Sequence, residues 1–506
     1  MTKNIIIAAS EMTPLSKTGG LADVIDGLSR ALADSKGARV TVFMPLYRGV
    51  SEHMTPTGTS IKVPVGADIV DGELYMTKLK GSAVTVYAIK NDAYYDRDAL
   101  YGDRDGDYKD NLERFIFFSR GVLEAVLALK LKADILHCND WQTGLIPAYL
   151  KTIYKDDPTF NKTATLFTIH NLAYQGIFKK EAFAKTNLPK GCFSVDGLEF
   201  WGKLNLMKSG IVYADVITTV SETYSVEIQS MEQGMGLEGL LGEKAAEGRL
   251  FGILNGVDYD KWSPEGDELI PANYGIGELR GKAVCKKALL KEFSLKVPPA
   301  TPVVAMVSRL VDQKGLDIVE EAIAEGLLKL NMVLIILGTG EERYKKFLKE
   351  TVKKYPKKLK VHIGFDEELA HRIEAGADIL LMPSLYEPCG LSQIYSLRYG
   401  TIPVVRAVGG LNDTVIDYLD DDTVAGHGDR DGKPKAATGT GFKFKEYTGK
   451  ALVKSVERSL KVFFDKGSWR ALRRRAMAED FSWDSSVERY MKLYEMATTK
   501  TFVPKK

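Results

Sequence analysis

Three loops in the sequence combine glycines with charged side chains, a combination suited to binding a phosphorylated polyol. The first, Lys17-Thr18-Gly19-Gly20, follows a β-branched run and precedes an amphipathic segment. Paired glycines let backbone amides approach an anion, a helix N-terminus adds partial positive charge, and Lys17 adds a full charge. The loop matches neither the G-x-G-x-x-G pattern of dinucleotide-binding proteins nor the phosphate loop of nucleotide hydrolases. It disfavours NAD and simple nucleotide hydrolysis, and a tight turn that needs glycine only for its geometry remains an alternative.

The second loop carries two cations after another β-branched run. It contains Ser308-Arg309-Leu310 and then Gln313-Lys314-Gly315. Ligands of open α/β sheets bind where a strand end turns into a helix, and Arg309 and Lys314 at such a place are suited to two phosphate oxygens. Together with Lys17 they indicate a diphosphate. The alternative is that both are solvated surface charges.

The third loop runs from Pro383 to Gln393, again from a predicted strand into a predicted helix. Glu387 can accept hydrogen bonds from sugar hydroxyls, and the backbone amides of Gly390 and Leu391 precede the helix. This pattern indicates a polyol site, although a plain helix N-cap would use the same residue types. Two further turns have related features. One contains Gly410 and Thr414 and repeats the pattern of a glycine turn before a helix. The other contains Gly338 and offers glycine backbone to a flat base.

Short β-branched runs alternate with longer amphipathic segments along the chain, which predicts an α/β protein with doubly wound parallel sheets. In the first half we predict helices at 21–33 and 111–129, β-hairpins within 61–89, and strands at 4–9, 39–44, 134–138, 165–170 and 216–220. In the second half we predict helices at 316–328 and 342–355 and strands at 303–307, 333–337, 360–363, 379–382 and 403–406. Each half thus predicts one sheet covered by helices.

The pattern of the two halves predicts domains at 1–258 and 259–480, with a last helix in 481–506. Residues 262–274 are rich in Pro, Gly and acidic residues and are interpreted as a polar linker, and 420–441 as an exposed loop. Ser482 or Asp484 is the predicted N-cap of the last helix, whose apolar face carries Val487, Tyr490 and Leu493. We expect this face to dock on another part of the chain, for example the first domain.

Composition excludes several classes of protein. The 506 residues carry 69 Lys plus Arg against 67 Asp plus Glu, and 45% are hydrophobic, so the chain can fill large cores and is not disordered. A net charge of +2 gives no global field for nucleic acid or an anionic membrane. The 4 cysteines form no C-x-x-C pair, and no apolar run is long enough for export or membrane insertion. We therefore expect a cytoplasmic protein without nucleic-acid or membrane partners.

Six motifs in order between residues 4 and 490 resemble the bacterial glycogen synthase and plant starch synthase family, glycosyltransferase family 5. They are KTGGLADV, HNLAYQG, ILNGVD, SRLVDQKG, LMPSLYEPCGLSQ and RYGTIPVVRAVGGLNDTV. The resemblance implies two facing Rossmann-like domains, the GT-B arrangement, with a deep cleft between them. It also implies retaining transfer of glucose from ADP-glucose or UDP-glucose to the non-reducing end of an α-1,4-glucan such as glycogen or a starch primer.

The resemblance also implies roles for individual residues. For the donor diphosphate these are Lys17, Gly20, Arg309 and Lys314. For the donor glucose they are His170, Asn255, Glu387, Cys389, Gly390 and Leu391. Further binding positions at the site are Gly19, Asp23, Tyr95, Asp140, Gly338, Gly410 and Thr414. The wider superfamily often has a second glutamate eight residues after the first, and this chain has Tyr395 there, which leaves recognition of the ribose open.

No metal or other cofactor is expected. Asp103-Arg104-Asp105 superficially offers the D-x-D pair that other nucleotide-sugar transferases use for a divalent ion, but solvated or acceptor-facing acids fit this segment better. Retention allows double displacement or attack on the face of the leaving group, and we favour the latter. The alternatives are a glucan phosphorylase, which would need pyridoxal phosphate and a longer chain, and a noncatalytic glucan-binding scaffold descended from a transferase. Oligomeric state and donor base stay open.

Overall fold

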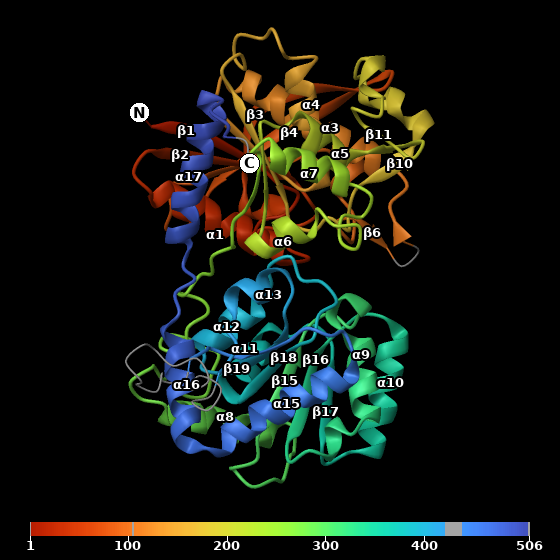
Figure 1. Cartoon of the computed structure of the whole chain (residues 1–506). Coiled ribbons are helices and arrows are strands. Elements are labelled where there is room, and N and C mark those ends of the chain that lie inside the picture. The colour runs from red at the N-terminus through yellow and green to blue at the C-terminus, as the bar shows by residue number, and fades with distance from the viewer. Residues whose placement is uncertain (1, 104–105, 420–437, 504–506) are drawn as a thin grey trace, which may run out of the picture. The chain divides into compact units, whose positions relative to one another are not determined.

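The chain folds into two compact units in the computed structural model, which describes residues 2–103, 106–419 and 438–503 (Figure 1). Unit 1 consists of residues 1–256 and 483–506, and unit 2 of residues 257–482. The chain therefore passes from unit 1 to unit 2 after Gly256 and returns after Ser482, close to the predicted boundaries at 258 and 480.

Unit 1 is built on a mostly parallel sheet with the strand order β14-β13-β9-β8-β1-β2-β5-β4-β3. Its parallel strands are β1 (Lys3–Ala8), β2 (Ala38–Pro45), β5 (Thr85–Lys90), β8 (Ile135–Asn139), β9 (Ala164–Ile169), β13 (Val216–Thr219) and β14 (Leu250–Gly252). Most of their residues are buried, which is what the near-continuous apolar runs predict for a sheet covered on both faces.

The predicted hairpins within 61–89 belong to this sheet. Strands β3 (Thr55–Val65) and β4 (Asp68–Lys78) are antiparallel to each other, and β4 is antiparallel to β5. Because β5 pairs in parallel with β2, the hairpin extends the edge of the main sheet. The alternating exposure along β3 and β4 shows one solvated face, as expected of an antiparallel edge.

Helices cover the faces of the unit 1 sheet. Those of the main frame are α1 (Gly20–Asp34), α3 (Asn111–Ala128), α4 (Leu145–Lys151), α5 (Leu206–Tyr213), α6 (Glu222–Glu227), α7 (Glu238–Ala246) and α17 (Trp483–Thr499). A separate small sheet has the order β10-β12-β11, with β10 (Ile177–Lys179), β11 (Glu199–Phe200) and β12 (Lys203–Asn205). The short elements α2 (Asp92–Tyr95), β6 (Gly102–Asp103) and β7 (Gly106–Asp107) lie in the connection before α3.

The last helix, α17, packs in the core of unit 1. Its face of Val487, Tyr490 and Leu493 lies in the same buried cluster as the β-strands, and the helix packs against α1 and β9. The indole of Trp483 fills the space above Gly27, where a β-carbon would stand 2.1 Å from the indole nitrogen. The helix begins at Trp483, between the two predicted N-cap residues.

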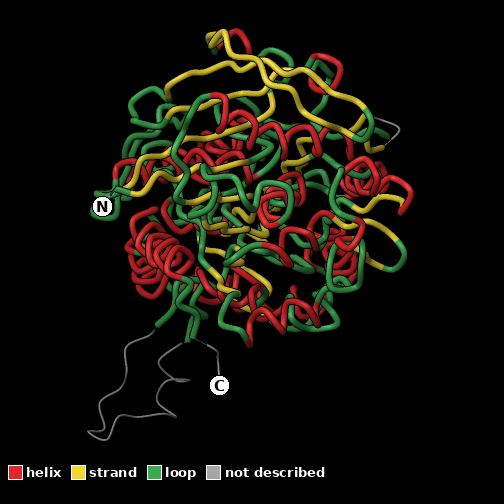
Figure 2. The backbone as a smooth tube through the Cα atoms, turned by 90° about the horizontal axis from the view of Figure 1, so that it is seen from above, coloured by secondary structure: helices red, strands yellow, loops and turns green. Residues whose placement is uncertain are grey.

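Unit 2 contains a parallel sheet with the order β17-β16-β15-β18-β19-β20. The strands are β15 (Val303–Val307), β16 (Val333–Gly338), β17 (Leu359–Ile363), β18 (Ile379–Met382), β19 (Ile402–Arg406) and β20 (Phe442–Phe444). Helices α8 (Arg280–Glu292) and α11 (Glu367–Gly376) pack on one face, and α9 (Leu316–Ala324), α10 (Glu342–Lys354) and α15 (Gly449–Phe464) on the other. Figure 2 gives the view of the chain from above, with the helices in red and the strands in yellow.

The described part of unit 2 also contains the short helices α12 (Ser392–Arg398) and α13 (Gly409–Thr414) and the longer helix α16 (Lys466–Ala478). The predicted helix 316–328 ends earlier, at Ala324, because Gly326 adopts a left-handed φ of 107°. In the ranges that the structure describes, no helix has both the length and the apolar character needed to cross a membrane. Most of the predicted loop 420–441 lies outside the described residues.

The predicted polar linker at 262–274 is wrong, because this segment packs onto unit 2. The ring of Trp262 stacks between His371 at 3.7 Å and Tyr395 at 4.0 Å between ring centres. The buried carboxylate of Asp267 accepts a hydrogen bond from His371 at 2.8 Å. The content of Pro, Gly and acidic residues suggested a linker, but Trp262 and Asp267 attach the segment to unit 2.

Candidate active site

Several of the predicted site residues lie where the strand order of each sheet reverses. In unit 1 the reversal lies between β1 and β8, and in unit 2 between β15 and β18. Loops that leave adjacent parallel strands in opposite directions open a crevice at the carboxyl ends of the strands, where doubly wound sheets bind ligands. The loops after β1 and β15 carry the predicted phosphate-binding residues, and those after β8 and β18 carry Asp140 and Glu387.

In unit 1 the glycine loop after β1 is held by a carboxylate. Glu11, which is 4% exposed, accepts hydrogen bonds from the backbone amide of Thr18 at 2.5 Å and from that of Gly19 at 3.3 Å. It also accepts from the hydroxyl of Tyr101 at 2.6 Å. Gly19 is the N-cap of α1 and Gly20 is its first residue, and both are exposed. The loop thus exposes the N-terminus of α1 to solvent, and the buried carboxylate of Glu11 holds the loop in this conformation.

Lys17 is tied to the first turn of α1. Its ammonium lies 2.9 Å from the carboxylate of Asp23, which also accepts from the hydroxyl of Thr13 at 3.1 Å. About a third of each charged side chain is exposed, so the pair is worth at most about 1 kcal/mol. A stronger anion can therefore draw Lys17 away from Asp23 at low cost.

Asp140 orients the loop that carries His170. Its backbone adopts a left-handed φ of 58°, which is strained for a residue other than glycine. Its carboxylate accepts the backbone amide of His170 at 2.8 Å. Burial raises the pKa of the Asp140 carboxyl to about 7, against the opposing effect of hydrogen bonds from the amides of His170 and Asn171. The carboxyl therefore changes charge near neutral pH while it holds this loop.

The tautomer of His170 follows from its neighbour Asn139. The side-chain amide nitrogen of Asn139 donates to the carbonyls of Ala8 at 3.1 Å and His137 at 3.3 Å, so its oxygen must accept. That oxygen lies 2.9 Å from Nε2 of His170, which therefore carries the proton. Burial lowers the pKa of His170 to about 3. The ring is neutral at physiological pH and presents Nδ1 as a hydrogen-bond acceptor.

Two predicted residues of unit 1 differ from the others in their surroundings. Tyr95 is completely buried and donates its hydroxyl to the carbonyl of Arg114 at 2.8 Å, so the structure does not bring it to the carboxyl edge as a ligand-contacting group. Asn255 is 5% exposed and its side-chain oxygen has no hydrogen-bond partner among the described residues. Leaving a buried acceptor unpaired costs about 1–3 kcal/mol of folding free energy. A ligand that donates a hydrogen bond to this oxygen would offset that cost.

In unit 2 the predicted cation and carboxylate contact each other. The ammonium of Lys314 lies 2.5 Å from the carboxylate of Glu387, which also accepts from the hydroxyl of Ser384 at 3.0 Å. The side chains are 18% and 6% exposed, so neither charge is well solvated. Removing one partner would leave the other buried and uncompensated, at a cost of about 3–5 kcal/mol.

Gly315 and Arg309 complete the turn that positions Lys314. Gly315 has a φ of 77°, and a β-carbon there would stand 2.1 Å from the carbonyl oxygen of Pro383. Only glycine allows the loops after β15 and β18 to approach this closely. Arg309 donates to the side chain of Gln313 at 2.8 Å across the same turn. A β-carbon at Gly338 would likewise collide with the carbonyl oxygen of Ser308, at 1.9 Å, so β16 ends against this turn.

The loop after β18 is joined to α13 through backbone contacts. The amide of Gly410 donates to the carbonyl of Glu387 at 3.1 Å, and a β-carbon at Gly410 would meet the backbone of Cys389. Gln393 donates to the carbonyls of Cys389 and Gly390, both at 3.0 Å, and to the hydroxyl of Thr414 at 3.1 Å. Leu391 is the N-cap of α12. Thr414 and the thiol of Cys389 are buried, so they shape this loop from within.

Several residues that shape the site were not predicted from the sequence: Glu11, Asn139, Ser384 and Gln393. A carboxylate directly after β1 and an amide at the end of β8 are visible as buried polar residues at strand ends, and this signal could have found Glu11 and Asn139. Among the described residues, no three His, Cys, Asp or Glu side chains are grouped as a metal site would require. Asp105 of the D-x-D segment lies outside the described residues.

Comparison with known proteins matches one sequence profile to each half of the chain. The sequence profile of the starch synthase catalytic domain matches residues 4–243, and that of glycosyl transferases group 1 matches residues 290–461. Glycogen synthase of Koribacter versatilis is 45% identical over 98% of both chains. The chain belongs to the glycogen synthase and starch synthase family. Glycogen synthase of Syntrophotalea carbinolica is 44% identical over 98% of this chain and 99% of its own.

Solved structures extend the family assignment to the fold. The catalytic domain of starch synthase IV from Arabidopsis thaliana, bound to ADP and acarbose, has a TM-score of 0.87 at 30% identity, with 98% of this chain and 99% of that chain covered. Sucrose-phosphate synthase from Thermosynechococcus elongatus has a TM-score of 0.57 at 15% identity and covers 99% of this chain and 100% of its own, and it shows the fold alone. The predicted α/β fold of GT-B type, with two parallel sheets, is confirmed, and this member of the family is a glycosyltransferase enzyme.

Proposed function

We propose that the protein transfers glucose from ADP-glucose or UDP-glucose to the non-reducing end of an α-1,4-glucan, with retention at the anomeric carbon. The observation that carries this proposal is the Lys314 and Glu387 pair at the reversal point of the unit 2 sheet, beside Arg309. The pair supplies a cation for a phosphate and a carboxylate for sugar hydroxyls within one loop cluster. The relatives named glycogen synthase and the starch synthase IV structure with ADP and acarbose support a sugar-nucleotide donor and a glucan acceptor.

The donor binds mainly to unit 2 in this proposal. Arg309 and Lys314 hold the diphosphate, and the backbone after β18, including Gly390 and Leu391, binds the glucose with Glu387. When phosphate replaces Glu387 as the partner of Lys314, the carboxylate becomes available to accept from sugar hydroxyls. Charge builds on the phosphate as the bond to the anomeric carbon breaks, and preorganised cations contribute most where charge develops in the transition state.

His170 has a binding role in this proposal. A neutral imidazole with a pKa near 3 and the proton on Nε2 is a poor proton donor to the leaving group, but Nδ1 accepts a hydrogen bond from a sugar hydroxyl well. Asp140 positions the ring by holding its backbone amide. Lys17 and the amides of Gly19 and Gly20 add a second anion-binding element on unit 1.

The reaction proceeds by attack on the face of the leaving group. The acceptor hydroxyl oxygen forms the new bond to the anomeric carbon while the bond from that carbon to the phosphate oxygen breaks. The hydroxyl proton passes to a phosphate oxygen, and the products are the lengthened glucan and the nucleoside diphosphate. The cationic residues neutralise the leaving group, so we propose that no metal or other cofactor is required. The reaction takes place in the cytoplasm, where reduced thiols such as the four free cysteines persist.

The test is the incorporation of labelled glucose into glycogen from each donor in the presence of EDTA. We expect transfer that survives EDTA, with one donor preferred, and an α-1,4 product by proton NMR. Absence of transfer from both donors, with glycogen binding intact, would contradict the proposal and favour a noncatalytic glucan-binding scaffold.

A further inference from the structure

An exposed tryptophan occupies a backbone conformation that does not suit it. Trp201 and Gly202 form the two-residue loop between β11 and β12, with φ of 53° and 75°. Hairpin loops with positive φ at both positions favour Asn-Gly, and a bulky residue at the first position is an outlier. The Trp201 side chain is 82% exposed. Neither the turn nor the hydrophobic effect explains tryptophan here.

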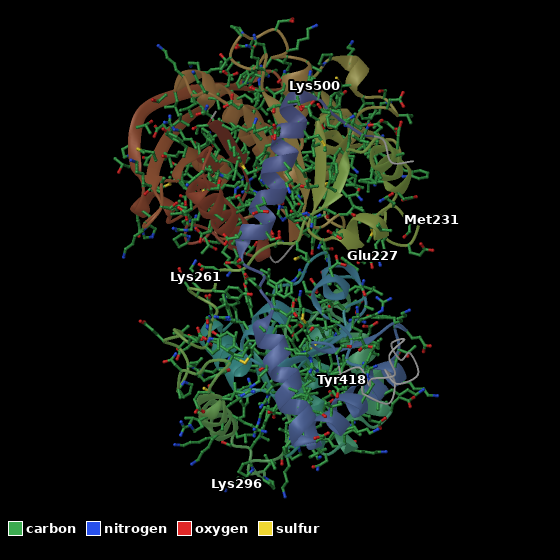
Figure 3. All side chains as sticks on the ribbon, turned by 60° about the vertical axis from the view of Figure 1, so that its left-hand side comes forward. Glu227, Met231, Lys261, Lys296, Tyr418 and Lys500 are labelled. Carbon is green, nitrogen blue, oxygen red and sulfur yellow. The ribbon has the colours of Figure 1, made fainter. Side chains whose placement is uncertain are left out.

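A second large hydrophobic residue shares these features and lies next to the first. Met235 has a φ of 52°, is 41% exposed and is followed by Gly236 at a φ of 83°. A β-carbon at Gly236 would stand 3.4 Å from the indole nitrogen of Trp201. In the described ranges, Trp201 and Met235 are the large hydrophobic residues with positive φ. Figure 3 shows Met231, earlier on the same segment, at the surface of unit 1.

The surface around Trp201 continues to the loop of His170. The side chain of Gln175 donates to the carbonyl of Met235 at 3.1 Å and thereby joins the two segments. Tyr174, which is 53% exposed, donates its backbone amide to the carbonyl of Asn171 at 3.2 Å. Because Tyr174 follows His170 by four residues, the two lie within about 14 Å of each other. The exposed side chain of Tyr174 therefore lies on the loop that carries His170.

We propose that Trp201, with Tyr174 and Met235, binds a stretch of α-glucan chain beyond the sugar that reacts. This inference rests on the proposed function and assigns a surface of unit 1 to its acceptor. A glucose ring has apolar C–H faces and a rim of hydroxyls, so an indole face binds it by stacking, with polar groups at the edge. Glu199 and Lys203 flank Trp201 in sequence and their charges offset each other, which suits an uncharged polymer. Backbone strain retained at an exposed ligand-binding residue is a recognised feature of functional sites.

The test compares acceptor kinetics of the wild type with Trp201→Ala, with Ile69→Ala as the matched control. Ile69 lies on β4 of the same unit and is 58% exposed. We expect Trp201→Ala to raise KM for maltoheptaose about tenfold, equivalent to about 1.4 kcal/mol, with kcat and the donor KM within about twofold. Ile69→Ala should match the wild type. An unchanged KM in Trp201→Ala overturns the inference. If that variant also loses self-association, the surface binds a second copy of the chain instead of glucan.

Two further variants separate binding from structure. Trp201→Asn suits the turn, so we expect a higher thermal midpoint together with the same loss of acceptor affinity. Trp201→Phe keeps an aromatic face and should retain most of the affinity. Equal KM values in Trp201→Asn and the wild type overturn the inference. Calorimetric titration with maltoheptaose gives the same comparison without turnover, so a failure of the proposed transfer activity remains distinguishable from a failure of this surface.

Discussion

Asp140 shows how one residue links the stability of the fold to the chemistry of the site. It combines a strained backbone, a partly buried carboxyl and two amide donors from the loop that carries His170. The residue type and its place after a strand could be read from the sequence. Its raised pKa could not, because burial and the amide donors come from the packing of β8 against β9.

The raised pKa of Asp140 predicts a pH-dependent difference between the wild type and Asp140→Asn. A carboxyl whose folded pKa lies near 7, above its usual value near 4, binds its proton more tightly in the folded state. Its contribution to stability is present below pH 4 and is lost as the pH rises through 7. The thermal midpoint of the wild type should therefore fall relative to Asp140→Asn between pH 4.5 and 7.5, by the equivalent of a few kcal/mol. Calorimetry at three pH values measures this, and a constant difference would refute the pKa shift.

Burial also decides which of the predicted residues can meet a ligand. Glycines and cations at strand ends were visible in the sequence, and the structure places Arg309, Lys314 and Glu387 in one loop cluster. Tyr95 also offers a polar hydroxyl, but it is buried against Arg114. Nothing in its local sequence pattern distinguishes it from an exposed tyrosine. The chemical character of these side chains is therefore visible in the sequence, whereas their exposure depends on the fold.

At the scale of elements, alternating apolar runs predicted the strands and helices of both sheets because each strand is buried on two faces. Ends were less predictable, as for α9, which stops at a left-handed glycine. The segment 262–274 was misinterpreted because its buried aromatic contacts are long-range. Local composition does not report such contacts.

The turn into α9 predicts a difference between two glycines. Gly315 before the helix and Gly326 after it both have positive φ, at 77° and 107°. A β-carbon at Gly315 would also collide with the carbonyl of Pro383, whereas at Gly326 it would stand 3.4 Å from the flexible side chain of Lys329. Alanine should lower stability at both positions by about 1–3 kcal/mol, but only Gly315→Ala should lower kcat/KM for the donor, since it displaces Lys314. Equal transfer rates in both variants would show that this turn does not position the site.

At the scale of the whole molecule, the chain leaves unit 1 once and returns to it through α17. Trp483, at the start of this helix, packs on Gly27 and Gly256, and the hydroxyl of Ser486 donates to the carbonyl of Leu254 at 2.6 Å. The residues before the first crossing and those after the second are thus joined within unit 1. The amphipathic pattern of the helix was visible in the sequence, but its position in this core depends on glycines more than 200 residues away.

This arrangement predicts that Trp483→Ala destabilises unit 1 selectively. Replacing a buried tryptophan by alanine costs about 3–5 kcal/mol, and the loss should appear in the unit that the residue packs against. Hydrogen exchange should increase in β1 and α1 and remain unchanged in β15 and β16. The matched control is Trp469→Ala in α16, which is 4% exposed and should have the opposite pattern. A uniform increase through both units in Trp483→Ala would contradict the division.

The central claim is that cations at the carboxyl edge of unit 2 supply the charge stabilisation for glucosyl transfer without a metal. The most direct measurement is the initial rate of transfer from the preferred donor to glycogen, in EDTA, for the wild type, Lys314→Ala and Lys296→Ala. Lys296, labelled in Figure 3, is an exposed lysine of the same unit outside the site. We predict that Lys314→Ala lowers kcat by about 100- to 1,000-fold while Lys296→Ala matches the wild type. A wild-type enzyme inactive in EDTA, or a Lys314→Ala variant with full kcat, would contradict the account.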